Sequence, residues 1–139
     1  ANLELFRARP WTGAGWHHNL ELAGQWIRQW HPGQEVFVGH AHNNLLEVLG
    51  GTGLCGLVGW IGWNFWLGLA LWRQSRPEPG RPEWFRELTQ GFLAGFVVFH
   101  LNGLTQVNFW EGKVQHQISW VVAWVLFGLL HSRQKEPVS

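Results

Sequence analysis

The feature that most constrains this chain is a long run without formal charge. From Val48 to Trp72 there is no Asp, Glu, Lys or Arg, and the nineteen residues from Leu54 to Trp72 are mostly apolar. As an α-helix, the shorter stretch spans about 28 Å, close to the thickness of a bilayer's hydrocarbon core. Because a soluble helix of this length normally carries a polar stripe, the run predicts a membrane-spanning helix.

Two further charge-free runs follow, at Leu88–Trp110 and Val114–Leu130. The sequence therefore predicts an all-α fold, that of a polytopic membrane protein whose membrane part covers residues 48–131. The three transmembrane helices are expected at about 54–72, 88–108 and 114–131. Three buried helices of a soluble bundle are the alternative, which the near absence of polar stripes in the first and third runs disfavours.

Composition agrees with a membrane location. The chain has twelve Trp residues and only 14% charged residues, and Trp gathers at bilayer–water boundaries. The net charge of +1 gives no reason to expect nucleic acid as a partner. Cys55 is the only cysteine, so an internal disulfide is excluded. Because no Met occurs, we expect the chain to be a piece of a longer protein.

The linkers predict the orientation. Four arginines, three prolines and a glycine fall between the first two runs, and residues 132–139 carry Arg133 and Lys135. Basic loops stay in the cytoplasm by the positive-inside tendency. The arginines of the linker are Arg73, Arg76, Arg81 and Arg86. Residues 1–47 are then expected to face outward as a loop region.

That outward region is expected to lie along the membrane surface. Pro10–Gly15 (PWTGAG) predicts a turn. Leu20–Trp30 has apolar residues at the 3.6-residue period, so it predicts a short interfacial helix, with Asn19 as its cap. Residues 35–39 (EVFVG) read as a short extended segment.

His42 stands just before the first apolar run. Asn43 or Asn44 is a suitable cap for a helix that begins with LLEVL. This would place His42 at a helix N-terminus, where unpaired backbone N–H groups favour an anion such as phosphate. The alternative is an ordinary loop histidine.

A metal site is the rival interpretation of the histidines. Five imidazoles could contribute, from His17, His18, His31, His40 and His42. No cysteine joins them, and the carboxylates lack ligand spacing. The sequence therefore predicts no metal site.

Polar and small residues inside the apolar runs have structural interpretations. Gly53, Gly56, Gly59 and Gly62 recur at steps of three, which predicts a ridge for close helix packing. Asn102, Thr105 and Gln106 form a stripe expected to bond neighbouring helices. His100 is either a neutral packing residue or a functional group within the membrane.

The His42 segment reads His42-Asn43, nine residues, Gly53, two residues, Gly56, immediately before the first predicted span. This resembles the signature of the O-antigen ligase and O-antigen polymerase family. Pro10–Gly15 also resembles the family's P-x-x-G-x-G turn, and Gly103–Trp110 resembles its late-membrane segment. The resemblance covers most of the chain.

The resemblance implies a multi-pass glycosyltransferase of the bacterial inner membrane, active in lipopolysaccharide or polysaccharide biosynthesis. Such enzymes transfer a glycan from a polyprenyl diphosphate lipid to a saccharide or lipid A core acceptor on the periplasmic side, without metal or cofactor. His42 would take the proton of the acceptor hydroxyl, since imidazole suits base catalysis near neutral pH.

The remaining implied roles are less closely tied to the motif. Arginines would stabilise the leaving diphosphate, and further arginines are expected upstream, so the chain alone should be inactive. Gly53 and Gly56 would be structural. The candidates for substrate binding are Arg7, Arg9, Arg28, His40 and Asn43.

Two other functions stay open at this point. One is a polytopic solute transporter, of the bicarbonate type, with His100 and the nearby amides lining a path. The other is a non-catalytic membrane scaffold. Ligase and polymerase differ in their acceptor, and the sequence does not separate them.

Overall fold

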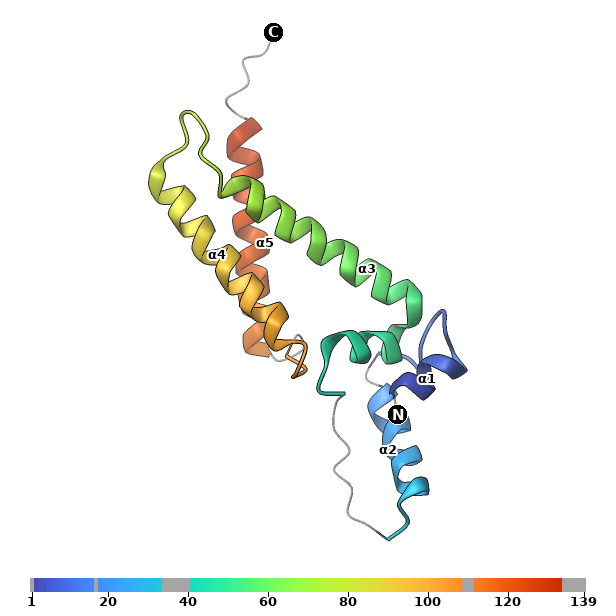
Figure 1. The fold of residues 1–139 in the computed structure, drawn as a ribbon. Coiled ribbons are helices and arrows are strands. Elements are labelled where there is room, and N and C mark those ends of the chain that lie inside the picture. The colour runs from blue at the N-terminus through green and yellow to red at the C-terminus, as the bar shows by residue number, and fades with distance from the viewer. Residues whose placement is uncertain (1, 17, 34–40, 109–111, 134–139) are drawn as a thin grey trace. The chain divides into compact units, whose positions relative to one another are not determined.

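The computed structural model describes residues 2–16, 18–33, 41–108 and 112–133, and every regular element in these ranges is a helix (Figure 1). The all-α prediction is confirmed. The chain divides into two compact units, one of residues 1–62 and 101–108 and the other of residues 63–100 and 109–139. The helices are α1 (Asn2–Ala8), α2 (His18–Trp30), α3 (Asn44–Gln74), α4 (Glu83–Asn102) and α5 (Gly112–Arg133).

Only α3, within the ranges that the structure describes, is long and apolar enough to cross a membrane. Val114–Leu130, inside α5, is apolar but shorter. The sequence predicted three membrane-spanning helices. In the described ranges, one helix meets the requirements of length and composition, and the other two spans stay predictions. α4 begins with a charged turn that contains Glu83, Arg86 and Glu87.

The second predicted span, at 88–108, is wrong as a single helix. α4 ends at Asn102, and the chain then turns. The turn is held by hydrogen bonds from the N–H groups of Thr105 and Gln106 to the carbonyl of Asn102, at 3.1 and 3.0 Å.

α3 starts ten residues before the predicted first span and changes direction at Gly53 (Figure 1). Gly53 has φ 65° and ψ −163°, a conformation that only glycine adopts without strain. The apolar run alone predicted the straight part of the helix. The cap at Asn43 or Asn44 predicted a helix that begins with LLEVL, which is the first part of α3, Asn44–Thr52. The kink that joins the two parts was not predicted.

The first unit has a small apolar core around α1 and α2. Leu5 and Ala14 are buried there, with Leu22 and Trp26 packed against them. The sequence did not predict α1, because seven residues are too few to form a stable helix without tertiary packing. The helix predicted at Leu20–Trp30 is present as α2, and it begins two residues earlier, at His18. Residues 35–39 lie outside the described ranges.

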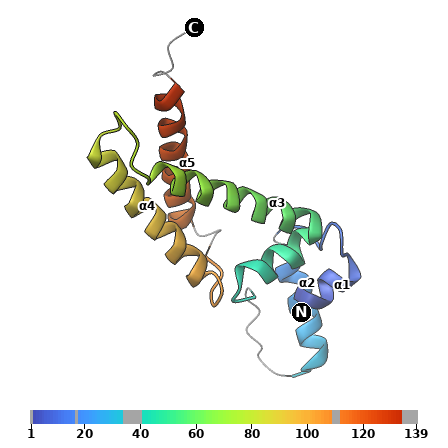
Figure 2. The same ribbon diagram turned by 45° about the horizontal axis from the view of Figure 1, so that its top comes forward.

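In the second unit, α4 and α5 lie side by side (Figure 2). The indole of Trp124 stacks on Phe85 and Phe92, with ring centroids 4.8 and 5.3 Å apart. Its Nε1–H donates to Thr89 Oγ1 at 2.9 Å. Such a pairing satisfies the polar end of a half-buried indole. Leu67, Leu71 and Val125 complete the core of this unit.

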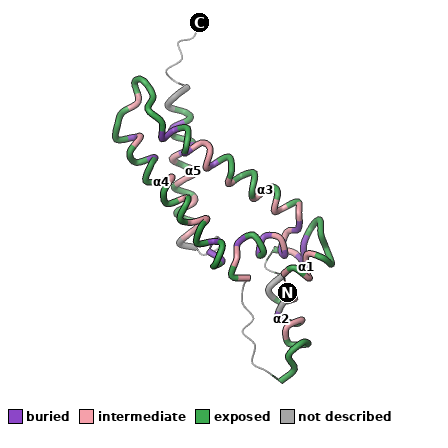
Figure 3. The backbone as a smooth tube through the Cα atoms, viewed as in Figure 1, coloured by how far each residue is buried: buried purple, intermediate pink, exposed green. Residues whose placement is uncertain are grey.

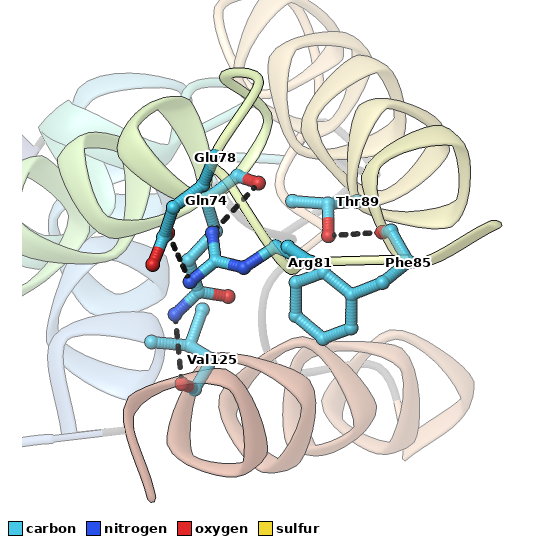
Figure 4. Close-up of polar contacts among 6 residues, drawn as sticks. All are labelled: Gln74, Glu78, Arg81, Phe85, Thr89 and Val125. Atoms are coloured by element: carbon cyan, nitrogen blue, oxygen red, sulfur yellow. Dashed lines mark hydrogen bonds and ion pairs between the residues drawn. The ribbon is translucent and has the colours of Figure 1, made fainter. Parts of the chain in front are cut away.

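The loop after α3 is held by polar contacts with the helices of the same unit (Figure 4). Gln74 Nε2 donates to the carbonyl of Val125 at 2.9 Å. Arg81 donates to the carbonyl of Gln74 at 3.3 Å and pairs with Glu78 at 2.6 Å. The linker is therefore a structured connection, although its prolines forbid a continuous helix.

Many residues along α3, α4 and α5 are exposed (Figure 3), and they include large apolar side chains. Their exposed fractions exceed 60% at Val58, Phe65, Val98, Leu101, Trp120 and Leu130. An apolar surface of this extent is typical of a region that contacts lipid or another protein.

Candidate functional site

His42 occupies an unusual backbone position at the start of α3. Its φ of 53° makes it the one non-glycine residue with positive φ in the described ranges. Histidine adopts the left-handed region more readily than most residues, yet such a conformation is still uncommon and is often found at functional sites. The imidazole is exposed.

Asn43 caps α3, as the sequence predicted for Asn43 or Asn44. Its Oδ1 accepts the backbone N–H of Leu46 at 3.1 Å. Its Nδ2 donates to the carbonyl of Leu104 at 2.9 Å. One side chain therefore both caps the helix and ties it to the segment that follows α4.

Asn44 makes the strongest connection to that segment. Its Nδ2 donates to Asn108 Oδ1 at 2.7 Å, and its Oδ1 accepts the backbone N–H of Asn108 at 3.1 Å. The backbone N–H of Asn44 donates to the carbonyl of Gly103 at 2.8 Å. Asn44 and Asn108 are 1% and 6% exposed, so these bonds satisfy polar groups that would otherwise be buried unpaired.

Gln106 reaches the imidazole itself. Its Oε1 lies 3.1 Å from His42 Nδ1. The sequence assigned Gln106 to a stripe on a transmembrane helix, and this is wrong because α4 has already ended at Asn102. Because Gln106 follows the helix, the direction of its side chain is not set by α4, and the side chain contacts His42.

Glu47 is a buried carboxylate in the first turn of α3, and sequence reasoning missed it. Only 1% of it is exposed. It accepts the backbone N–H of Ala41 at 2.7 Å and the Nδ2 of Asn2 at 3.3 Å. Glu47 therefore fixes the residue that precedes His42. A carboxylate five residues after His42 was the sequence feature that could have indicated a contact near this histidine.

The Pro10–Gly15 turn, which the sequence predicted, supplies acceptors to the kink in α3. The break at Gly53 removes the helical acceptors of Leu54 and Cys55, which would lie four residues back. The N–H of Leu54 instead donates to the carbonyl of Pro10 at 2.8 Å. The N–H of Cys55 donates to the carbonyl of Trp11 at 3.2 Å.

The same turn also supplies donors. The carbonyls of Gly50 and Gly51 lose their helical donors at the kink. They accept the N–H groups of Ala14 and Gly15, both at 2.9 Å. The turn thus supplies partners to four backbone groups around the break, the N–H groups of Leu54 and Cys55 and the carbonyls of Gly50 and Gly51.

The first glycine of the predicted ridge, Gly53, does not serve the packing of another helix. A Cβ on Gly53 would lie 2.5 Å from the carbonyl of Trp11, so Gly53 packs against the turn rather than against another helix. A Cβ on Gly56 would meet the side chain of Thr52 of the same helix. The Cβ positions of Gly59 and Gly62 face open space in the described chain, and their helix-packing role stays a prediction.

The arginines proposed for substrate binding differ in their surroundings. Arg7 pairs with Glu4 at 2.6 Å on the surface of α1. Arg9 and Arg28 are exposed, after α1 and in the last turn of α2. The contacts described above hold His42 through amides and backbone groups, and none of them comes from these arginines. His40 lies outside the described residues.

Two other histidine predictions can be compared with the structure. In the described ranges, no group of three or more His, Cys, Asp or Glu residues is placed to hold a metal ion. His100 packs edge-on against the rings of Phe96 and Phe99, with centroids 4.5 and 5.0 Å apart. Those contacts are typical of a packing histidine.

An apolar cavity of about 500 Å³ lies between α4 and α5. Gly91 and Gly95 form part of its wall, with Phe96 and Val121. Its lining has no titratable side chain. The cavity can hold an apolar chain, and it offers no acid, base or nucleophile.

No family model, curated protein or solved structure matches this chain. A functional interpretation therefore depends on the residues and contacts described above.

Proposed function

We propose that this chain takes part in O-antigen ligase- or polymerase-like glycan transfer at the outer face of a bacterial inner membrane. The donor is a glycan on a polyprenyl diphosphate lipid, and the acceptor is a sugar hydroxyl. The observation that carries the proposal is the exposed imidazole of His42, held through Nδ1 by Gln106 at the start of α3.

The proposed reaction is a single displacement. His42 takes the proton from the acceptor hydroxyl as its oxygen bonds to the anomeric carbon of the donor. The bond from that carbon to the diphosphate breaks, and the lipid diphosphate leaves with the electron pair. The proton then passes from the imidazole to solvent. General-base catalysis of this kind contributes about 10²–10⁴-fold, and it needs no metal.

The membrane placement has independent support. α3 meets the requirements of length and composition for a span. In this proposal α4 and α5 provide the second and third spans, which would explain the exposed Val98, Leu101 and Trp120. The basic linker after α3 would face the cytoplasm, so His42, at the other end of α3, would face outward.

The test is the surface glycan of cells whose copy of the protein carries His42→Ala. We expect glycan transfer to be lost while the amount of protein in the membrane is unchanged. His31→Ala is the matched control, since His31 is exposed in the same outward region, and it should leave the glycan unaltered. An unchanged glycan in His42→Ala would refute the proposal.

A further inference from the structure

The contact between Gln106 and His42 has a chemical consequence. The amide Oε1 of Gln106, 3.1 Å from His42 Nδ1, can only accept a hydrogen bond. Nδ1 therefore carries the hydrogen in this arrangement. In a neutral imidazole, Nε2 then holds the lone pair that takes up a proton. The contact selects one of the two tautomers.

Gln106 is well placed to make this selection, because its backbone is anchored on both sides. Before it, the carbonyls of Gly103 and Leu104 accept hydrogen bonds from the start of α3. After it, Val107 is 1% exposed and Asn108 is bonded to Asn44. The buried neighbours hold the segment in place, while the exposed Gln106 side chain extends to the imidazole.

We propose that Gln106 is a positioning residue that keeps His42 in the Nδ1–H tautomer and so makes Nε2 the basic nitrogen. The tautomer follows from Oε1 of Gln106, the acceptor atom of the amide, facing Nδ1. Its effect on glycan transfer rests on the function proposed for His42. Which ring nitrogen of a catalytic histidine is protonated is set by the hydrogen bond that the other nitrogen makes.

An amide suits this role better than a carboxylate would. A glutamate at position 106 would also accept from Nδ1–H, but its negative charge would favour the protonated imidazolium. His42 would then keep its proton to higher pH and would serve as a base only there. A neutral amide accepts from Nδ1–H without adding a charge beside the imidazole.

The first experiment reads the tautomer without any catalytic assay. The chain is labelled with ¹⁵N-histidine in lipid nanodiscs, and the His42 signals are assigned by their loss in His42→Ala. We expect the Nδ1–H form to predominate in the wild type and the Nε2–H form to increase in Gln106→Leu. Because Gln106 is exposed, this substitution should leave the fold intact. Equal tautomer populations in the two proteins would overturn the inference.

The second experiment measures the pH dependence of glycan transfer in membranes that contain the protein. Gln106→Leu should lower the rate about 10-fold or more across the pH range, within the contribution of a general base. Gln106→Glu should retain transfer and move the acidic limb of the profile upward by about one pH unit. Gln29→Glu is the matched control, since it adds the same charge at an exposed site of α2.

The two experiments separate this inference from the proposed function. Unchanged transfer in His42→Ala would refute the base role of His42, whereas a tautomer that still responds to Gln106→Leu would leave the tautomer assignment in place. Profiles of Gln106→Leu and Gln106→Glu that both match the wild type would refute the kinetic role of Gln106.

Discussion

Gly13 and Gly53 pack backbone against backbone, so closely that neither can carry a side chain. A Cβ on Gly13 would lie 2.6 Å from the N atom of Gly53, and a Cβ on Gly53 would lie 2.7 Å from the N atom of Gly13. Both residues have φ 65°. The Pro10–Gly15 turn and the first part of α3 thus pack together as one structural unit.

Gly53→Ala should destabilise the chain strongly, because it combines a backbone conformation reserved for glycine with a clash against the carbonyl of Trp11. We expect a loss of more than about 3 kcal/mol, since the strain alone costs 1–3 kcal/mol. Thermal unfolding of the purified chain in detergent would measure it.

Gly59→Ala is the matched control for that measurement. Gly59 is helical and its Cβ position faces open space, so alanine should stabilise the helix by about 0.5–1 kcal/mol. Equal effects of the two substitutions would show that Gly53 does not form the kink described here.

The amide pair of Asn44 and Asn108 should behave as one unit. Either alanine substitution removes the buried bond from Asn44 Nδ2 to Asn108 Oδ1 and leaves the remaining atom without it, which costs about 1–3 kcal/mol. The double variant removes both groups, so it should lose less than the sum of the single losses, with a coupling of at least about 1 kcal/mol. A double-mutant cycle of unfolding free energies tests this, and additivity within about 0.5 kcal/mol would argue against the pair.

The local features of this fold were predictable, whereas the contacts between distant segments were not. The apolar run indicated α3, Asn43 was a suitable cap, and Pro10 with Gly13 indicated the turn, because each depends on neighbouring residues alone. The bond from His42 to Gln106 joins residues 64 apart. This bond can form because α4 ends at Asn102. The apolar pattern of the sequence did not indicate that end.

The kink at Gly53 shows the same limit. Glycines at steps of three are compatible both with a helix-packing ridge and with a break, and the sequence favoured the ridge. The break exists because the Pro10–Gly15 turn replaces the lost hydrogen bonds. These replacement hydrogen bonds come from a segment about forty residues away in the chain, so the local sequence around Gly53 does not predict them.

The orientation proposed for the chain predicts the accessibility of single cysteines. Cys55 is exposed and must first be replaced by serine. In spheroplasts, a membrane-impermeant maleimide should label Gln29→Cys, in α2, without permeabilisation. It should label Pro79→Cys, in the loop after α3, only after permeabilisation. The reverse pattern would place His42 in the cytoplasm and exclude the proposed reaction.

The most direct measurement is the rate of glycan transfer by isolated membranes that contain either the wild-type protein or His42→Ala, with and without added imidazole. The account predicts a fall of about 10²–10⁴-fold in His42→Ala, with part of the rate restored by imidazole as a replacement base. A His42→Ala rate within twofold of the wild type would contradict it.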